Sequence, residues 1–469
     1  MCMVTAGYTS RPWQTPEPEP VHVPQRSPAD LAIKARWILP VEPAGQVLEE
    51  HALLVRGGRI VALVPSDQLA PGDALQVVDR PEHALIPGLV NAHTHAAMCL
   101  LRNLSASLGL DDWLRKLVWP LEARLVDEQF VADGTELAIA EMLLGGITCF
   151  ADMYYFPEVA ARVAAGAGIR AAIGLPMLEQ PTPWAQDLDE YLARSLRLSD
   201  EYRADPLIET LFCLHSPSAT SDASLKRVRT LADQLQAQVM IHLLESSTER
   251  ERVERKYGRG PFERLQDAGL VNDLLIAVHC VQANAHEIEA LAVSGASVVH
   301  CPASNLRLAS GIAPLAEMRL AGLNVGLGTD GAASNDSLDI LGEARLAALL
   351  AAGVTGNAAV LTPHAALEMA TLAGARALGL ADRTGSLVTG KWADIACLRL
   401  TGPEATPHHD IAAAVVHAAG RPAVTDTWVA GRALVADGRL ARMNASDVID
   451  RAQRWMPRVL AAMDAIAGQ

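Results

Sequence analysis

Short apolar segments alternate with longer helical segments through the middle of this chain. Eight apolar segments have the length and composition of buried strands: 85–92, 147–151, 170–175, 208–214, 238–243, 274–278, 296–300 and 324–328. Between several of them, for example at 132–144 and 221–236, Leu, Ala and Ile recur at helical spacing. Because strands that alternate with helices form parallel sheets, eight such units predict an α/β fold, a (β/α)8 barrel of the TIM type.

Both ends of the chain carry β-hairpin signals outside this alternation. Residues 51–64 read HALLVRGGRIVALV and residues 428–440 read WVAGRALVADGRL, each with apolar runs around glycine turns. We expect these terminal segments to combine into one small β-sandwich domain. The predicted domains are an extension at 1–26, the two parts of the β-sandwich at 27–86 and 381–445, the barrel at 87–380 and a C-terminal helix at 446–469.

Composition narrows the classes of partner. Half of the 469 residues are hydrophobic, which is enough for a large core. The formal net charge is -15, whereas a nucleic-acid backbone or an anionic membrane surface needs a basic patch on the protein. We therefore expect a small-molecule substrate, no nucleic-acid partner and no membrane partner.

The cysteines and the N-terminal segment indicate a cytoplasmic protein. Seven cysteines are scattered without a CxxC pair, a pattern typical of buried reduced thiols rather than a disulfide framework. Residues 1–26 are rich in Pro, Thr and Glu and lack the basic start and apolar stretch of a signal peptide. No uninterrupted apolar stretch is long enough to span a bilayer. We expect residues 1–26 to be a disordered extension.

Five of the strand candidates end in residues that bind metals or transfer protons. His93 and His95 lie at the end of the first, and the other strand ends carry His215, His242, His279 and Asp330. Catalytic residues of an α/β barrel gather at the carboxyl ends of its strands, where the loops form the site. The pattern therefore predicts a functional site at this end of the barrel.

His93 and His95 are two residues apart, so their side chains share one face of a strand and can bind one ion. With His242 and Asp330 they offer three imidazoles and one carboxylate, which suit Zn²⁺ and leave room for water. Each has an ordinary alternative, because a lone histidine can pack in the core and a strand-end aspartate can cap a helix. Glu245, three residues after His242, could likewise be a solvated carboxylate at a helix start. Together these residues favour a zinc hydrolase.

The other histidines near the strand ends are predicted to act around this metal site. His279 could be a fourth nitrogen ligand, but we assign it to orienting the bound water because four protein ligands are already present. His215 is predicted to contact the substrate, and His300 is left outside the catalytic set. The lysines fall outside the proposed strand ends, so a carbamylated lysine is not expected to hold a second ion, and we predict one metal.

Five motifs carry a resemblance to a known family. They are PGLVNAHTH at 87–95, WPLEAR at 119–124, HLLE at 242–245, CPASNL at 301–306 and GTDGAASN at 328–335. The chain resembles the amidohydrolase superfamily and, more closely, the 5′-methylthioadenosine/S-adenosylhomocysteine deaminases. The resemblance runs from about residue 30 to residue 440, and the segment at 385–394 resembles the family's return into its β-domain.

The resemblance implies a role for each matching residue. His93, His95, His242 and Asp330 would bind one Zn²⁺ per subunit, although Fe²⁺ or Mn²⁺ could occupy the same ligands. The implied catalytic residues are Glu245, His279 and Asp330, and the implied substrate contacts are Glu122 to the ribose hydroxyls, His215, Glu245 and Ser334. The implied reaction is hydrolytic deamination at purine C6, which releases ammonia and leaves the inosine analogue.

One departure from the family bears on the substrate. Some relatives hold a homocysteine carboxylate with arginines before the motif at His215, but this chain has no Arg or Lys between Arg170 and Arg194. The neutral substrate 5′-methylthioadenosine is therefore our first expectation, and S-adenosylhomocysteine or adenosine is the second. A clamp from a neighbouring subunit would change this order, and the resemblance implies a homodimer or homotetramer.

Two other functions stay open. The same metal site could deaminate guanine or another heterocycle, or hydrolyse a triazine, and only a ribose-bearing substrate needs Glu122. A metal-free barrel retained as an assembly protein is the alternative from a different class. Such a scaffold would have lost ligands, whereas this chain keeps all four.

Overall fold

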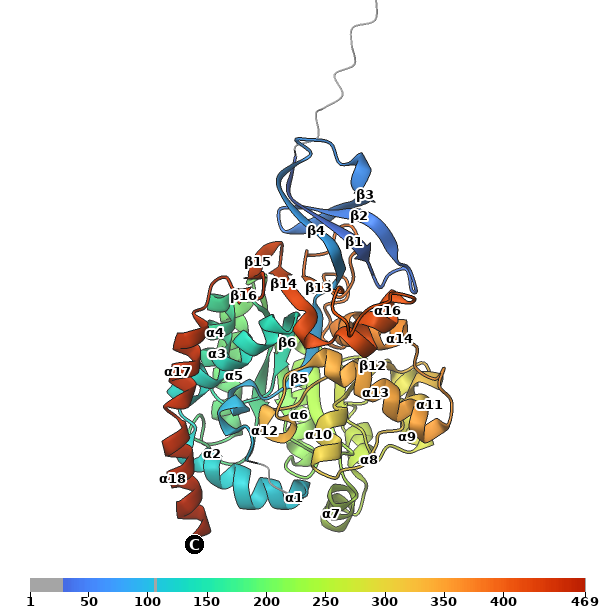
Figure 1. Ribbon diagram of the computed structural model, residues 1–469. Coiled ribbons are helices and arrows are strands. Elements are labelled where there is room, and N and C mark those ends of the chain that lie inside the picture. The colour runs from blue at the N-terminus through green and yellow to red at the C-terminus, as the bar shows by residue number, and fades with distance from the viewer. Residues whose placement is uncertain (1–27, 105–107, 469) are drawn as a thin grey trace, which may run out of the picture.

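A barrel of parallel strands forms the centre of the molecule (Figure 1). The computed structural model describes residues 28–104 and 108–468, so the predicted extension at 1–26 lies outside the described residues. Eight strands pair in chain order: β5 (Leu89–Thr94), β6 (Ile147–Asp152), β7 (Arg170–Met177), β8 (Ile208–Leu214), β9 (Val239–Leu243), β10 (Leu275–His279), β11 (Ser297–His300) and β12 (Asn324–Leu327). The predicted (β/α)8 barrel is confirmed.

Side chains join the first strand of the barrel to the last. Asn91 on β5 donates from Nδ2 to Thr329 Oγ1 at 2.7 Å, and the Thr329 amide donates back to Asn91 Oδ1 at 3.0 Å. The backbone amide of Asp330 donates to the carbonyl oxygen of His93 at 3.1 Å. These bonds hold the carboxyl ends of β5 and β12 side by side, so residues more than 200 positions apart in the sequence share one site.

The first predicted barrel strand, at 85–92, is divided between two sheets. Residues 85–87 belong to β4 (Ala74–Pro87) of the second sheet, and β5 begins at Leu89. Gly88 lies between them, and a Cβ at this position would be only 2.0 Å from Thr148 Oγ1. The chain passes so close to β6 here that only glycine fits, which allows one apolar run to serve both sheets.

The terminal segments form the second sheet. Its strands lie in the order β16 (Arg439–Leu440), β15 (Arg432–Ala436), β14 (Val424–Val429), β13 (Ile395–Arg399), β4, β1 (Ala29–Ile38), β2 (Leu48–Arg56) and β3 (Arg59–Pro65). Both expected hairpins are present, because β2 pairs with β3 and β14 pairs with β15, each antiparallel. The N-terminal and C-terminal parts meet where β4 pairs with β13, so the expected small domain built from both chain ends is confirmed.

Helices surround the barrel on its outer side (Figure 1). Those between the barrel strands are α1 (Leu110–Trp113), α2 (Trp119–Leu125), α3 (Glu128–Leu144), α4 (Pro157–Ala167), α5 (Leu188–Tyr202), α6 (Asp222–Leu235), α7 (Ser247–Tyr257), α8 (Pro261–Asp267), α9 (Ala285–Ser294), α10 (Pro302–Arg307) and α11 (Leu315–Leu320). After β12 come α12 (Ala332–Asn335), α13 (Ile340–Thr355), α14 (Pro363–Glu368), α15 (Gly374–Ala377) and α16 (Ile411–Ala413). None of the helices in the described ranges is long and apolar enough to cross a membrane.

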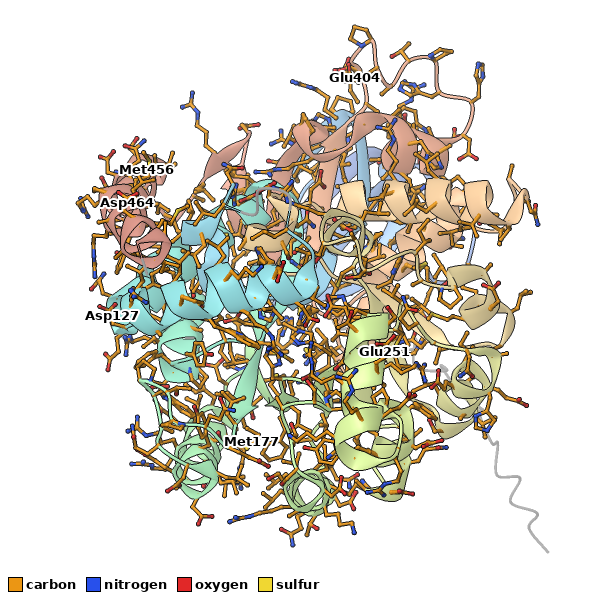
Figure 2. The ribbon with its side chains drawn as sticks, turned by 90° about the horizontal axis from the view of Figure 1, so that it is seen from below. Asp127, Met177, Glu251, Glu404, Met456 and Asp464 are labelled. Atoms are coloured by element: carbon orange, nitrogen blue, oxygen red, sulfur yellow. The ribbon has the colours of Figure 1, made fainter. Side chains whose placement is uncertain are left out.

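The C-terminal segment contains two helices, α17 (Ala445–Gln453) and α18 (Met456–Ala467), where the sequence predicts one. Between them Trp455 packs edge-on against Phe130, with ring centroids 5.1 Å apart, and its Nε1 donates to Asp133 Oδ2 at 2.9 Å. This anchor holds the segment against α3. Seen from below, α18 with Met456 lies at the outer edge of the molecule, away from α7 with Glu251 (Figure 2).

A buried ion pair joins the two sheets. Arg170 on β7 donates from Nε to Asp394 Oδ2 at 2.9 Å, and both side chains are almost fully buried. Asp394, just before β13, also accepts from Thr384 Oγ1 at 2.9 Å and from the Ala430 amide at 2.7 Å. Because removing one member would leave an unpaired buried charge, this contact fixes the second sheet against the barrel.

Candidate metal centre and substrate pocket

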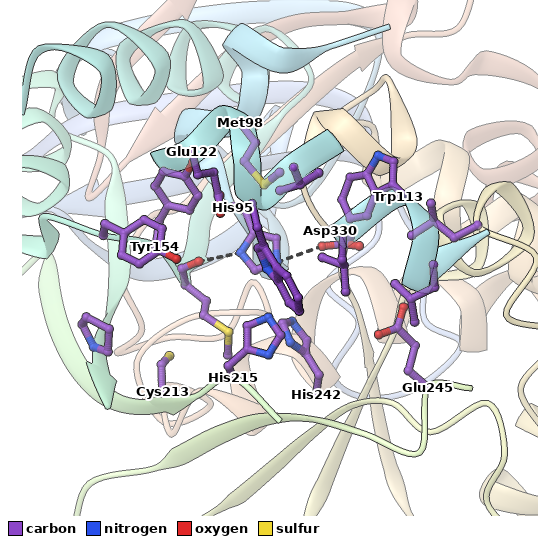
Figure 3. A pocket seen from close by; sticks show the side chains of 18 of the residues that line it. His95, Met98, Trp113, Glu122, Tyr154, Cys213, His215, His242, Glu245 and Asp330 are labelled. Carbon is purple, nitrogen blue, oxygen red and sulfur yellow. Dashed lines mark hydrogen bonds and ion pairs between the residues drawn. The ribbon is translucent and has the colours of Figure 1, made fainter. Parts of the chain in front are cut away.

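A cavity opens at the carboxyl ends of the barrel strands (Figure 3). The polar side chains that line it come from widely separated parts of the sequence: His95, Glu122, Tyr154, Tyr155, His215, His242, Glu245, His279 and Asp330. His93 lies fully buried beneath it. The structure therefore brings together every predicted site residue except Ser334 around this cavity, including all of the strand-end residues.

The imidazole and carboxylate groups at the base of the cavity could surround one cation. His242 Nε2 lies 3.1 Å from His93 Nε2, and Asp330 Oδ1 lies 3.2 Å from His95 Nε2 and 3.5 Å from His93 Nε2. Two overlapping groups meet the spacing of a metal site: His93, His242 and His279, and His93, His95 and Asp330. Three imidazoles with a carboxylate are a donor set that fits zinc.

The hydrogen bond that His95 makes on the side away from the other histidines indicates which ring nitrogen could bind a metal. Its Nδ1 donates to the carbonyl oxygen of Met153 at 2.5 Å, which leaves Nε2 facing the cluster. Burial lowers the pKa of His95, but the hydrogen bond and the charge of Asp330 raise it to about 9. The site thus favours a positive charge at this position, and a bound cation takes the place of that proton.

Asp330 lies at a sharp turn after β12, with a left-handed φ of 59°. Its Oδ2 accepts hydrogen bonds from Ser304 Oγ at 2.6 Å and Ser334 Oγ at 2.8 Å, and its Oδ1 faces His93 and His95. Burial alone would raise the pKa of Asp330, but the hydrogen bonds from His93 and His95 hold it well below the usual value. Asp330 is therefore a carboxylate whose two oxygens have separate partners.

Ser334, expected to contact the substrate, is directed elsewhere in the structure. Its hydroxyl donates to Asp330 Oδ2 and is 3.1 Å from the carbonyl oxygen of Gly331, and the residue is only 1% exposed. It is not among the residues that line the cavity. Its contacts here are with the Asp330 turn rather than with the pocket.

Glu245 and His279 face each other across the cavity. Glu245 Oε2 lies 3.8 Å from His279 Nε2. Burial, with the nearby charge of Asp330, raises the pKa of Glu245 well above its usual value. Burial lowers the pKa of His279 to about 3. These shifts favour the protonated form of Glu245 and the neutral form of His279, a pair that can donate protons and hydrogen bonds to a substrate.

A second carboxylate lies on another wall of the cavity, beside Tyr154 (Figure 3). Glu122, on α2, is buried, and burial raises its pKa to about 7. His215 follows β8, and burial lowers its pKa to about 4. The His215 ring lies 6.3 Å from that of Trp119 and 5.3 Å from that of His242, measured between centroids. Glu122 and His215 therefore offer polar contacts beyond the histidine cluster.

The rest of the cavity is apolar. Its lining includes Met98, Leu110, Trp113, Leu114, Val118, Trp119, Met153, Leu178 and Leu308. Five of these belong to the segment from α1 to α2, where a π-helical turn (Leu114–Val118) separates the two tryptophans. Trp119 is 41% exposed. Neither Lys nor Arg occurs among the described residues that line the cavity, so away from the histidine cluster a negatively charged ligand group meets no Lys or Arg side chain there.

Sequence reasoning missed two residues that contact the site from behind. Ser304 and Asn305 lie within the CPASNL motif, but no role was expected for either; both are buried on α10 and bond to Asp330 and His279. Tyr154 was also missed. Its position two residues after the end of β6 could have indicated it, because loops at strand ends form the site of a barrel.

The fold and the cluster together define a metal-dependent hydrolase of the (β/α)8 barrel class. Residues 84–434 match the amidohydrolase family, and the chain belongs to that family. The membership expected from the motifs is therefore confirmed, and with it the expectation that the protein is an enzyme.

Relatives of named activity agree with the expected subgroup. A 5-methylthioadenosine/S-adenosylhomocysteine deaminase of Teredinibacter turnerae is 43% identical over 92% of this chain and 98% of its own. A 5′-deoxyadenosine deaminase of Methanosarcina mazei is 36% identical over 93% of this chain and its full length. The crystal structure of an adenosine deaminase from Xanthomonas campestris with bound zinc is 45% identical, with a TM-score of 0.91 over 93% of this chain and 99% of that one.

Proposed function

We propose that this protein is a zinc-dependent deaminase that hydrolyses the C6 amino group of adenosine analogues, with 5′-methylthioadenosine preferred. The observation that carries the proposal is one cavity that joins a histidine–aspartate cluster to an acid, Glu245, and to a distant carboxylate, Glu122. A purine nucleoside has a matching order of groups, since its reacting carbon and its ribose hydroxyls lie at opposite ends. The three relatives named above act on adenosine or its 5′ derivatives, which supports the same substrate class.

His93, His95, His242 and Asp330 would hold the zinc ion. When bound, zinc lowers the pKa of its water to about 7, so that a nucleophile is available at neutral pH. Glu245, protonated because of its burial, would donate to the purine N1 and make C6 electrophilic. Asp330, a carboxylate, would accept a proton from the attacking water and return it to the departing ammonia. The second proton of the water, released when the C6 carbonyl forms, would restore the acid form of Glu245, so that water and the nucleoside give ammonia and the inosine analogue and atoms and charges balance.

Glu122 and His215 would recognise the nucleoside. An ionised carboxylate accepts two hydrogen bonds, which suits the adjacent 2′ and 3′ hydroxyls of a ribose. His215, neutral at pH 7, can donate with one ring nitrogen and accept with the other. These two contacts would distinguish a nucleoside from a free base, because guanine and triazines have no ribose to bind to Glu122.

The apolar wall supports the order of substrates. A methylthio group can pack against Leu, Met and Trp side chains such as those of the α1–α2 segment. The amino acid end of S-adenosylhomocysteine carries a carboxylate, and burial of an unpaired charge is costly. Because no described lining residue is Lys or Arg, we propose that 5′-methylthioadenosine reacts faster than S-adenosylhomocysteine.

The test is ammonia release from purified zinc-loaded protein given 5′-methylthioadenosine, S-adenosylhomocysteine, adenosine and guanine in parallel. We expect the highest kcat/KM with 5′-methylthioadenosine. Equal or faster turnover of S-adenosylhomocysteine would contradict the proposed order and point to a cation from a neighbouring subunit. Turnover of guanine alone would contradict the assignment to nucleosides, but it would agree with the assignment as a hydrolase.

We also propose that the enzyme acts in the cytoplasm as a homodimer or homotetramer. The six cysteines of the described ranges are all buried and free, which supports a reducing compartment. Light scattering of the purified protein measures its mass directly. A single species at the 49.9 kDa mass of one chain would contradict the oligomer.

A further inference from the structure

His279 is held on its far side by an amide. The Nδ2 atom of Asn305 lies 3.0 Å from His279 Nδ1, and both residues are 1% exposed. The other ring nitrogen, Nε2, faces Glu245 and the cavity. Because the two nitrogens of a neutral imidazole have different roles, the partner of Nδ1 decides what Nε2 can do.

An amide nitrogen can only donate a hydrogen bond. With Asn305 Nδ2 as the donor, His279 Nδ1 is the acceptor, and in a neutral ring the single proton then lies on Nε2. His95 has the opposite arrangement, because its Nδ1 faces the Met153 carbonyl oxygen as a donor and its Nε2 faces Asp330 and the other histidines. The two rings are thus prepared for different tasks: His95 as a ligand and His279 as a hydrogen-bond donor.

The backbone holds both partners in place. His279 and the following Cys280 adopt left-handed φ values of 75° and 50°, which are strained for residues with a side chain and persist only where the surrounding structure holds them. The backbone amide of Asn305 donates to the Cys301 carbonyl oxygen at 3.1 Å, and the backbone carbonyl oxygen of Asn305 accepts from the Ser310 amide at 2.8 Å. These backbone contacts fix the positions from which the two side chains face each other.

We propose that Asn305 is a positioning residue that fixes the Nε2–H form of His279. In this form His279 cannot coordinate a metal through Nε2 and instead donates a hydrogen bond toward the oxygen that adds to C6. The inference deepens the proposed function and rests on it for the identity of that oxygen. The proton position itself can be measured without any substrate.

The decisive measurement is long-range ¹H–¹⁵N correlation NMR of zinc-loaded protein labelled with ¹⁵N-histidine. A protonated Nε2 couples to both ring carbon-bound protons, whereas a protonated Nδ1 couples strongly to only one. His279→Ala identifies the resonances of this ring by their loss. We expect the Nε2–H pattern; a Nδ1–H pattern for His279 in the unaltered protein would overturn the proposal.

Substitution gives a second test. In Asn305→Asp a carboxylate replaces the amide donor, so Nδ1 must donate and the His279 pattern should change to Nδ1–H. We expect kcat to fall by about 10²–10³-fold, the loss typical of one transition-state donor, with little change in KM. Asn305→Ala, which adds no acceptor, should lower kcat less than Asn305→Asp does. An Asn305→Asp protein with the original pattern and full kcat would contradict the proposal.

Asn272→Asp is the matched control. Asn272 lies just before β10, the strand that ends in His279. Its substitution therefore makes the same chemical change at the opposite end of that strand. Its Oδ1 already accepts from the Leu274 amide at 2.8 Å, a bond that an aspartate keeps. We expect unchanged kcat and an unchanged His279 pattern. If no nucleoside is deaminated by any variant, the proposed function fails, but the NMR pattern still decides the role of Asn305.

Discussion

The hydroxyl of Ser304 donates to Oδ2 of Asp330 at 2.6 Å, with both residues buried beneath the cavity. Ser334 donates to the same oxygen, whereas the histidines face Oδ1. The two serines therefore orient the carboxylate and direct one of its oxygens to the histidine cluster. Outer partners of this kind orient metal ligands and tune their affinity.

Ser304→Ala should weaken metal binding. Loss of this donor leaves Asp330 Oδ2 with one hydroxyl partner, so the carboxylate can rotate away from the histidines. We expect affinity for zinc to fall by about 10- to 100-fold, measured by competition with a chelator. Ser310→Ala is the matched control, because the Ser310 hydroxyl is buried without a partner among the described residues. Equal loss in both variants would contradict this role for Ser304.

Glu245→Gln should impair chemistry more than binding. The amide has the shape of the acid but cannot transfer a proton to the purine N1. We expect kcat to fall by about 10²–10⁴-fold while KM changes little, measured by steady-state ammonia release. Glu251→Gln is the control, because Glu251 is an exposed glutamate on α7, the helix that follows Glu245. Turnover near that of the unaltered enzyme would remove Glu245 from the mechanism.

Glu122 should make nucleoside binding depend on pH. Its pKa is raised to about 7 by burial, so below this pH the group carries a proton and loses one acceptor for the ribose hydroxyls. We expect kcat/KM for adenosine analogues to rise as pH increases through about 7. Glu122→Gln cannot ionise and should abolish this inflection. The 2′,3′-dideoxy analogue should show no such rise with the unaltered enzyme; an identical profile for it would argue against a contact with the ribose.

Asp394→Ala should destabilise the whole molecule. The substitution leaves the Arg170 guanidinium buried between the sheets without its carboxylate, a change that costs about 3–5 kcal/mol. We expect a lower Tm by calorimetry. The double variant Arg170→Met/Asp394→Leu should recover much of the loss, because it removes the uncompensated charge. A Tm unchanged in Asp394→Ala would show that the ion pair does not hold the sheets together.

The sequence by itself determined the architecture and the residues of the metal cluster. Strand and helix periodicity are local properties, so the eight barrel strands could be located to within a few residues. The histidines and Asp330 could be recognised because parallel strands bring their carboxyl ends to one edge of a barrel. The division of the first predicted strand at Gly88 could not be predicted, because Thr148, the residue that approaches Gly88, belongs to another strand.

Tertiary structure alone decided how these residues are held. The contacts of Ser304 with Asp330 and of Asn305 with His279 join residues 26 positions apart, and no sequence periodicity specifies such bonds. The apolar segment from α1 to α2 likewise becomes a pocket wall only where it lies over the barrel mouth. Hydrogen-bond geometry and burial depend on packing between elements, which is why the sequence located the reactive residues and only the fold set their orientation.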